Sequence, residues 1–127
     1  MPPVMKSIVA DGTAAIPILI SQLTDSREIT PPLYPYWPST TVGELAYFIF
    51  RDLFSDRKRV VTVPELFPRI WECGLPAWQC WAAYRKTHSL NSLQSKFLKF
   101  WKANEANVYW DAEVRCFRLS RIRGNRP

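Results

Sequence analysis

One apolar segment constrains the fold more than any other part of the chain. "STTVGELAYFIFRDLFSD", residues 39–56, contains Thr41 and Glu44 at the spacing of a capping box, the reciprocal pairing that starts many helices. Apolar positions then recur with a helical period, at Val42, Leu45, Ala46, Ile49 and Leu53. The remaining faces are apolar as well, since they carry Tyr47, Phe48, Phe50 and Phe54. The segment therefore predicts a helix at the buried centre of the fold.

Helical periodicity also appears on both sides of this segment. Residues 14–24 carry one apolar stripe, and residues 76–88 and 89–104 carry two more. Between them, Pro64 suits the first position of a helix that Pro68 interrupts, so a short or broken helix is expected there. In the last of these helices the cations mostly fall away from the apolar stripe, at Lys96, Lys99 and Lys102.

Near the end of the chain, the pattern of apolar residues changes from a helical period to a period of two residues. "NVYWDAEVRCFRLS", residues 107–120, alternates around a turn at Asp111-Ala112, which indicates a short β-hairpin. Residues 121–127, "RIRGNRP", have the character of a basic flexible tail. The predicted fold class is therefore mainly α. Residues 1–120 form a single helical domain, a compact bundle of about five helices that ends in the β-hairpin.

Residues 13–54 resemble one unit of the HEAT-like helical repeats. "AAIPILISQLTDS" matches the first helix of the repeat pattern through Ala15, Pro17, Leu19, Ile20, Leu23 and Asp25. "TVGELAYFIFRDL" matches the second through Val42, Ala46 and Leu53. The connection is longer than in such repeats, and no second copy follows, although solenoids need several units. The resemblance implies a helical hairpin and a protein-binding scaffold. The chain is also similar in general character to small bacterial immunity proteins that neutralise a co-encoded toxin.

The enlarged connection is rich in proline and aromatic residues. "PPLYPYWPS", residues 31–39, carries Tyr34, Tyr36 and Trp37. These rings either fold back to cap the helical core or stand out as rigid anchors, the residue types that dominate binding hot spots. The two roles are compatible, since some rings can pack inward while others face a partner. We therefore expect these three rings to bind another protein, together with the nearby basic residues Arg57, Lys58 and Arg59.

Charge is unevenly distributed along the chain. Residues 1–56 carry a net charge of −3 and residues 57–127 one of +9. This polarity indicates an acidic partner for the second half, such as an acidic toxin or effector domain. The alternative is a nucleic acid, with the phosphates contacted by Lys96, Lys99, Lys102, Arg118, Arg121 and Arg123.

Catalytic and metal-binding patterns are weak. His88 is the single histidine, and its position favours a helix end over a general base. Glu44 and Asp52 lie on one helix, where solvent and neighbouring groups are adequate partners for both carboxylates. The cysteine spacing does not match a zinc site, and the scattered glycines cannot form a phosphate loop. We therefore expect a non-enzymatic protein without catalytic residues, metal or cofactor.

The three cysteines bear on the compartment. Cys73, Cys80 and Cys116 are expected to be buried thiols in a reducing cytosol, with a Cys73–Cys80 bridge as the alternative in an oxidising compartment. No apolar run is long enough to span a bilayer, so no membrane association is expected. The expected location is cytoplasmic, or periplasmic if a leader precedes the sequence.

Overall fold

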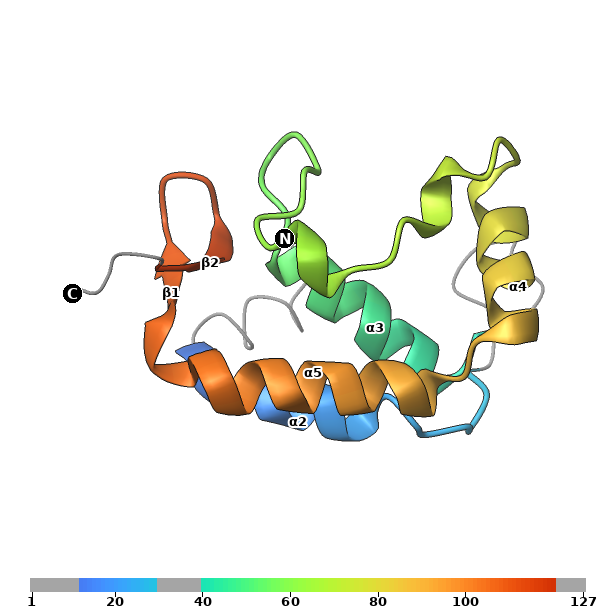
Figure 1. Cartoon of the computed structure of the whole chain (residues 1–127), viewed down its shortest axis with the longest axis horizontal. Helices are drawn as coiled ribbons and strands as arrows, with labels where there is room; N and C mark the ends of the chain where they lie inside the picture. The colour runs from blue at the N-terminus through green and yellow to red at the C-terminus, as the bar shows by residue number, and fades with distance from the viewer. Residues whose placement is uncertain (1–11, 30–39, 121–127) are drawn as a thin grey trace.

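The computed structural model describes residues 12–29 and 40–120 (Figure 1). These ranges contain four α-helices: α2 (Ala15–Gln22), α3 (Val42–Leu53), α4 (Ala77–Thr87) and α5 (Leu90–Asn104). An antiparallel hairpin follows, made of β1 (Val108–Asp111) and β2 (Cys116–Leu119). There are also four 3₁₀ helices: η1 (Gly12–Ala14), η2 (Pro64–Leu66), η3 (Ile70–Glu72) and η4 (Glu105–Asn107). The prediction of a mainly helical fold with a short β-hairpin is confirmed.

The number of α-helices in the described residues is four rather than about five. The short or broken helix expected after Pro64 consists of the two 3₁₀ turns η2 and η3. Pro64 does stand at the start of η2, as predicted. Pro68 then separates the two turns, because it has no N–H to donate to a continuing helix. The Pro68 carbonyl instead accepts a bond from the N–H of Ile70 at 2.9 Å.

Helix α3 forms the centre of the fold, as its sequence predicts. Thr41 Oγ1 accepts a hydrogen bond from the N–H of Glu44 at 3.1 Å, and Glu44 Oε1 accepts one from the N–H of Thr41 at 3.0 Å. The capping box is thus confirmed. Its inner face differs from the expected aliphatic stripe, since it consists of Gly43, Ala46, Tyr47, Phe50 and Leu53. Val42, Leu45 and Ile49 are only half-buried. The large rings take the core-facing positions because they bury the most apolar area.

The start of α3 touches the backbone that follows α2. Gly43 donates its N–H to the Asp25 carbonyl at 2.9 Å, and Val42 donates to the Arg27 carbonyl at 2.9 Å. A Cβ atom placed on Gly43 would lie 2.1 Å from the Leu23 carbonyl oxygen. Only glycine therefore allows this approach between the two helices.

Helix α5 lies alongside α2, with α3 packed against them (Figure 1). Gln94 of α5 donates a hydrogen bond to the Ile20 carbonyl of α2 at 3.0 Å. Between these helices an aromatic cluster fills the core, in which the Phe97 ring stacks on Phe50 at a centroid distance of 4.6 Å. Helix α4 lies at one end of the molecule and the β-hairpin at the other (Figure 1).

The β-hairpin pairs Val108 with Leu119 and Asp111 with Cys116. The turn is therefore longer than the predicted Asp111-Ala112 corner, since residues 112–115 connect the strands. Arg115 adopts a positive φ of 56°, the left-handed conformation that such turns require. Phe117 is fully buried, so one side of the hairpin closes the core beside α3.

Two of the predicted features lie outside the described residues: the aromatic connection with Tyr34, Tyr36 and Trp37, and the tail with Arg121 and Arg123. In residues 12–29 and 40–120, no helix has the length and apolar character needed to cross a bilayer.

Candidate functional site

A sharp cationic turn follows α3. Ser55 and Val61 form an isolated antiparallel bridge, and the chain between them reverses direction. The Asp56 carboxylate accepts the N–H of Lys58 at 2.8 Å and that of Val60 at 3.0 Å. Arg59 sits at the tightest point, with φ of 64°. The Asp56 carboxylate is thus hydrogen-bonded to the backbone of the turn. The cations of the turn are exposed to solvent: Arg57, Lys58 and Arg59.

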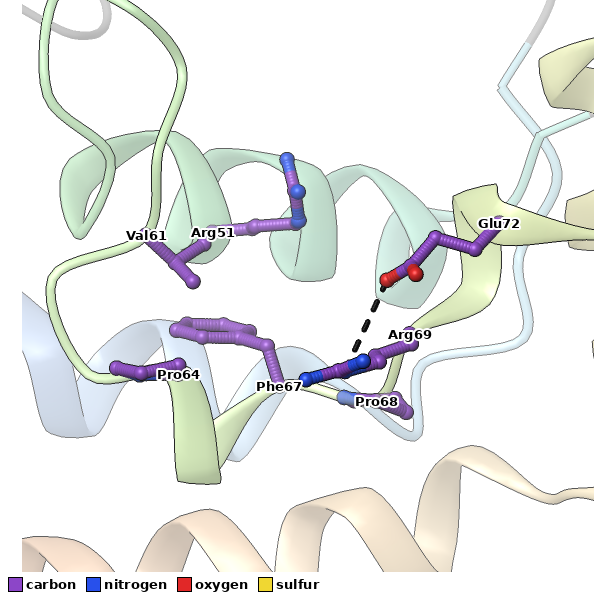
Figure 2. Close-up of a pocket in the computed structure, with 7 residues that line it drawn as sticks. All are labelled: Arg51, Val61, Pro64, Phe67, Pro68, Arg69 and Glu72. Atoms are coloured by element: carbon purple, nitrogen blue, oxygen red, sulfur yellow. Dashed lines mark ion pairs between the residues drawn. The ribbon is translucent and has the colours of Figure 1, made fainter.

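A pocket of about 430 Å³ opens next to this turn (Figure 2). Its apolar lining consists of Val61, Pro64, Phe67 and Pro68, and its charged lining consists of Arg51, Arg69 and Glu72. Figure 2 shows Val61, Pro64 and the Phe67 ring on one side, with Arg69 and Glu72 opposite and Arg51 projecting from α3. The pocket therefore combines an apolar surface with two guanidinium groups.

The ion pair inside the pocket is loose. Arg69 Nε lies 3.8 Å from Glu72 Oε2, and the two side chains are 85% and 65% exposed. Exposed pairs of this kind contribute about 0–1 kcal/mol, so little free energy is lost if either member exchanges its partner. Arg69 is therefore available to another carboxylate.

The turn and the pocket form one continuous surface, because Val61 ends the turn and also lines the pocket. The Asp52 carboxyl group interacts electrostatically with Arg51 of the pocket and with Arg59 of the turn. Desolvation raises the pKa of this carboxyl group, while the positive charges of Arg51 and Arg59 act against that rise. We call the five cations on this surface the cationic site: Arg51, Arg57, Lys58, Arg59 and Arg69. Three acids accompany them: Asp52, Asp56 and Glu72. Because the positive groups outnumber the negative ones, the surface favours a negatively charged partner.

The remaining predicted cations lie on other elements. Lys96, Lys99 and Lys102 are exposed on α5, as expected, and the first two border a hollow of about 260 Å³ beside Leu66 and Phe100. Arg118 lies on β2, where its Nη1 is 3.6 Å from Asp111 Oδ2. The hairpin is joined to the cationic turn through Thr62, whose hydroxyl donates to the Phe117 carbonyl at 2.7 Å.

The groups considered for catalysis make structural contacts. Glu44 Oε2 accepts a hydrogen bond from Trp81 Nε1 and lies 3.9 Å from Arg85 Nε, in addition to its role in the capping box. His88 follows the end of α4, where its ring stacks on Tyr84 at 4.3 Å and its Nδ1 lies 3.1 Å from the Tyr84 carbonyl. Within the described part of the chain, no three potential ligands from His, Cys, Asp and Glu come together in a metal-binding group.

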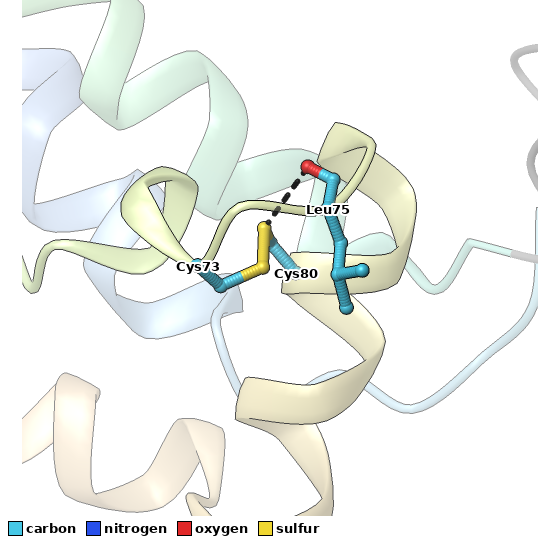
Figure 3. The surroundings of a disulfide bond; sticks show 3 residues. All are labelled: Cys73, Leu75 and Cys80. Carbon is cyan, nitrogen blue, oxygen red and sulfur yellow. Dashed lines mark hydrogen bonds between the residues drawn. A yellow bond between two sulfur atoms is a disulfide. The ribbon is translucent and has the colours of Figure 1, made fainter.

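Cys73 and Cys80 form a disulfide between η3 and α4 (Figure 3). The expectation of three buried thiols is therefore wrong, and the alternative bridge is present. The Cα atoms are 5.8 Å apart, because the corner after η3 turns the chain back onto the first turn of α4. Cys80 Sγ also lies 3.4 Å from the Leu75 carbonyl oxygen. Cys116 is a buried free thiol whose pKa is raised, chiefly by desolvation.

Reduction of this disulfide should destabilise the protein by about 2–3 kcal/mol, because the bridge limits the freedom of the unfolded chain. The measurement is urea unfolding of the wild type with and without a reducing agent. A Cys73→Ser/Cys80→Ser variant is the control, and its midpoint should not respond to the reductant. A wild-type midpoint that is the same in both conditions would contradict the prediction.

Sequence reasoning found the three cations of the turn but missed the pocket beside them. Its lining comes from α3, η2 and η3, and no short motif joins those elements. One available signal was Arg51, the single cation of the mainly apolar helix α3. Fold and site thus define a mainly helical protein with an aromatic core and a cationic surface pocket.

No protein-family model, curated protein or solved structure matches the chain.

Proposed function

We propose that this chain is a non-enzymatic protein-binding module that holds an acidic partner through the cationic site. The supporting observation concerns the turn after α3. Asp56 accepts hydrogen bonds from backbone N–H groups there, while the cations remain exposed, at Arg57, Lys58 and Arg59. A turn with that chemistry presents concentrated positive charge at little conformational cost, since its backbone is already fixed. Arginine is also enriched among the residues that dominate binding energy at interfaces.

An immunity-type role is the most specific form of this proposal. The cationic site would cover an acidic cleft of a toxin or effector domain, and the rings of residues 31–39 would add apolar contact. The HEAT-like resemblance of residues 13–54 supports a scaffold of this kind and remains part of the proposal. The Cys73–Cys80 disulfide favours an oxidising compartment such as the periplasm over the cytosol.

Nucleic-acid binding is the second candidate function. It is favoured by the exposed lysines of α5, two of which border a hollow that contains Phe100. Positive charge next to an aromatic ring is the combination that single-strand binders use. Its contacts would be phosphates, so its affinity should fall by orders of magnitude between about 50 and 200 mM salt.

The test is a pull-down from the native host under nuclease treatment, with two charge-reversal variants of equal charge change. We expect Arg57→Glu/Lys58→Glu to lose a partner protein that Lys96→Glu/Lys99→Glu retains. Arg59 is left unchanged in the first variant because its positive φ shapes the turn. A third variant, Tyr36→Ala/Trp37→Ala, measures the contribution of the aromatic connection.

The opposite pattern would overturn the proposal. If the lysine variant alone loses its bound material, and nuclease removes that material from the wild type, the protein binds nucleic acid through α5. If the turn variant retains the same partner as the wild type, the cationic site is not the contact surface.

A further inference from the structure

We propose that the pocket beside the cationic turn receives an aromatic side chain flanked by carboxylates, carried on a segment of the partner protein. This inference rests on the proposed protein-binding function and specifies the chemistry of its partner. It follows from the placement of two guanidinium groups beside an apolar surface (Figure 2).

The apolar part of the pocket suits a planar ring. Pro64, Phe67 and Pro68 contribute flat, rigid surfaces that lose little freedom when a ligand binds (Figure 2). Phe67 is only 6% exposed, so its ring is held by the core and cannot swing outward to fill the pocket. A volume of about 430 Å³ accommodates one large side chain with part of its backbone.

The charged part of the pocket suits carboxylates next to that ring. Arg51 reaches the pocket from α3 and Arg69 from the segment between η2 and η3. Guanidinium groups bind carboxylates in a two-pronged geometry that is stronger and more directional than a lysine contact. Glu72 is the single acid among the described lining residues, and it already contacts Arg69. A carboxylate from the partner would therefore compete with Glu72 for the same guanidinium.

Three short peptides separate the two parts of this recognition. The probes are acetyl-Glu-Phe-Glu-amide, acetyl-Gln-Phe-Gln-amide and acetyl-Glu-Ala-Glu-amide, each titrated into the isolated protein and followed by NMR. The first peptide should produce saturable shifts at Val61, Phe67 and Arg69. The uncharged peptide and the peptide without the ring should each bind at least about fivefold more weakly, because each lacks one of the two contacts.

Matched substitutions at exposed positions then locate the contact. Arg69→Gln should weaken the Glu-Phe-Glu peptide about threefold to fivefold and leave the Gln-Phe-Gln peptide unaffected. Glu72→Gln should strengthen the first peptide about twofold to threefold, because it removes the competing carboxylate. That gain in affinity would not arise from a purely structural role. Arg118→Gln is the control, since Arg118 is also an exposed arginine in a loose ion pair.

The inference is overturned if the three peptides bind equally, if the shifts map away from the pocket, or if Glu72→Gln weakens binding. These outcomes are distinguishable from failure of the proposed function, which is measured with host proteins. Selective peptide binding without a host partner would leave the pocket chemistry intact and remove the function. If the turn variant loses a host partner but the peptides bind without selectivity, the proposed function is supported and the proposed pocket chemistry is overturned.

Discussion

Gly43→Ala should reduce the free energy of unfolding by about 3 kcal/mol or more, a large effect for the addition of one methyl group. The new Cβ would lie 2.1 Å from the Leu23 carbonyl oxygen and 2.8 Å from its carbon. Both atoms belong to the backbone, so the clash cannot be relieved by rotation of a side chain. Helix α3 would have to move away from α2 and lose the bond from the Gly43 N–H to the Asp25 carbonyl. Thermal unfolding is the measurement, and the melting temperature should fall by roughly 10 °C.

Gly74→Ala is the matched control, because it introduces the same methyl group at a second glycine. Gly74 has φ of 84°, but a Cβ there would meet no atom within 4 Å. Its cost should be limited to the strain of the left-handed conformation, about 1–2 kcal/mol. Equal losses at both positions would mean that the approach between the two helices is not the reason for glycine at Gly43.

Phe97→Ala should destabilise the protein by about 3–5 kcal/mol, the usual cost of deleting a fully buried ring. The Phe97 ring is completely inaccessible to solvent, and it stacks on Phe50 and Tyr47 at centroid distances of 4.6 and 6.2 Å. It also meets Phe67 edge-on at 5.7 Å. The cavity would therefore extend beneath Phe67, which lines the pocket beside the cationic turn. Urea unfolding gives the stability change, and the peptide titration shows the effect on the pocket.

Leu98→Ala provides the comparison for this prediction. It removes an apolar side chain from the next position of the same helix, where the leucine is 40% exposed. Its effect should stay below about 1 kcal/mol, since most of the cost of Phe97→Ala comes from the cavity. If the two variants unfold at the same urea concentration, the aromatic cluster is not the main source of core stability.

Local sequence signals predicted the parts of the fold that depend on local physics. The capping box at Thr41 and Glu44 involves residues three positions apart, and the alternation before and after Asp111 depends only on neighbouring residues. The capping box and the hairpin were confirmed, whereas the turn comprises residues 112–115 rather than Asp111-Ala112, and the adjacent Cys116 and Phe117 are both buried. The break at Pro68 was also predicted, because proline acts through its own missing N–H. The tightness of the turn on either side could not be predicted, so a short or broken helix was expected where two 3₁₀ turns occur.

Features that depend on tertiary packing were predicted less well. Which residues of α3 face the core depends on contacts with Phe67, Trp81 and Phe97, which are distant in sequence. The cysteine pairing depends on the geometry of one corner, and the count of three cysteines left it open. The pocket requires Arg51 of α3 and Arg69, eighteen positions later, to line one hollow across a bend that no periodicity describes. The cations of the turn were identified because a run of charge is visible without any fold.

Among the described residues, those of the cationic site and the pocket all lie within residues 51–72. Most binding surfaces combine distant parts of a chain, so a change in specificity requires coordinated substitutions in several elements. In the function proposed above, one continuous segment would provide the contacts of the cationic site and the pocket, while α2 and α5 support it from other parts of the sequence. Under the proposed function, exchanging that segment as a unit would transfer the contacts of the cationic site and the pocket in one step, whereas the contribution proposed for residues 31–39 would stay with the scaffold. The same arrangement allows the segment to be replaced as a cassette in laboratory selection, with the rest of the helical scaffold held constant.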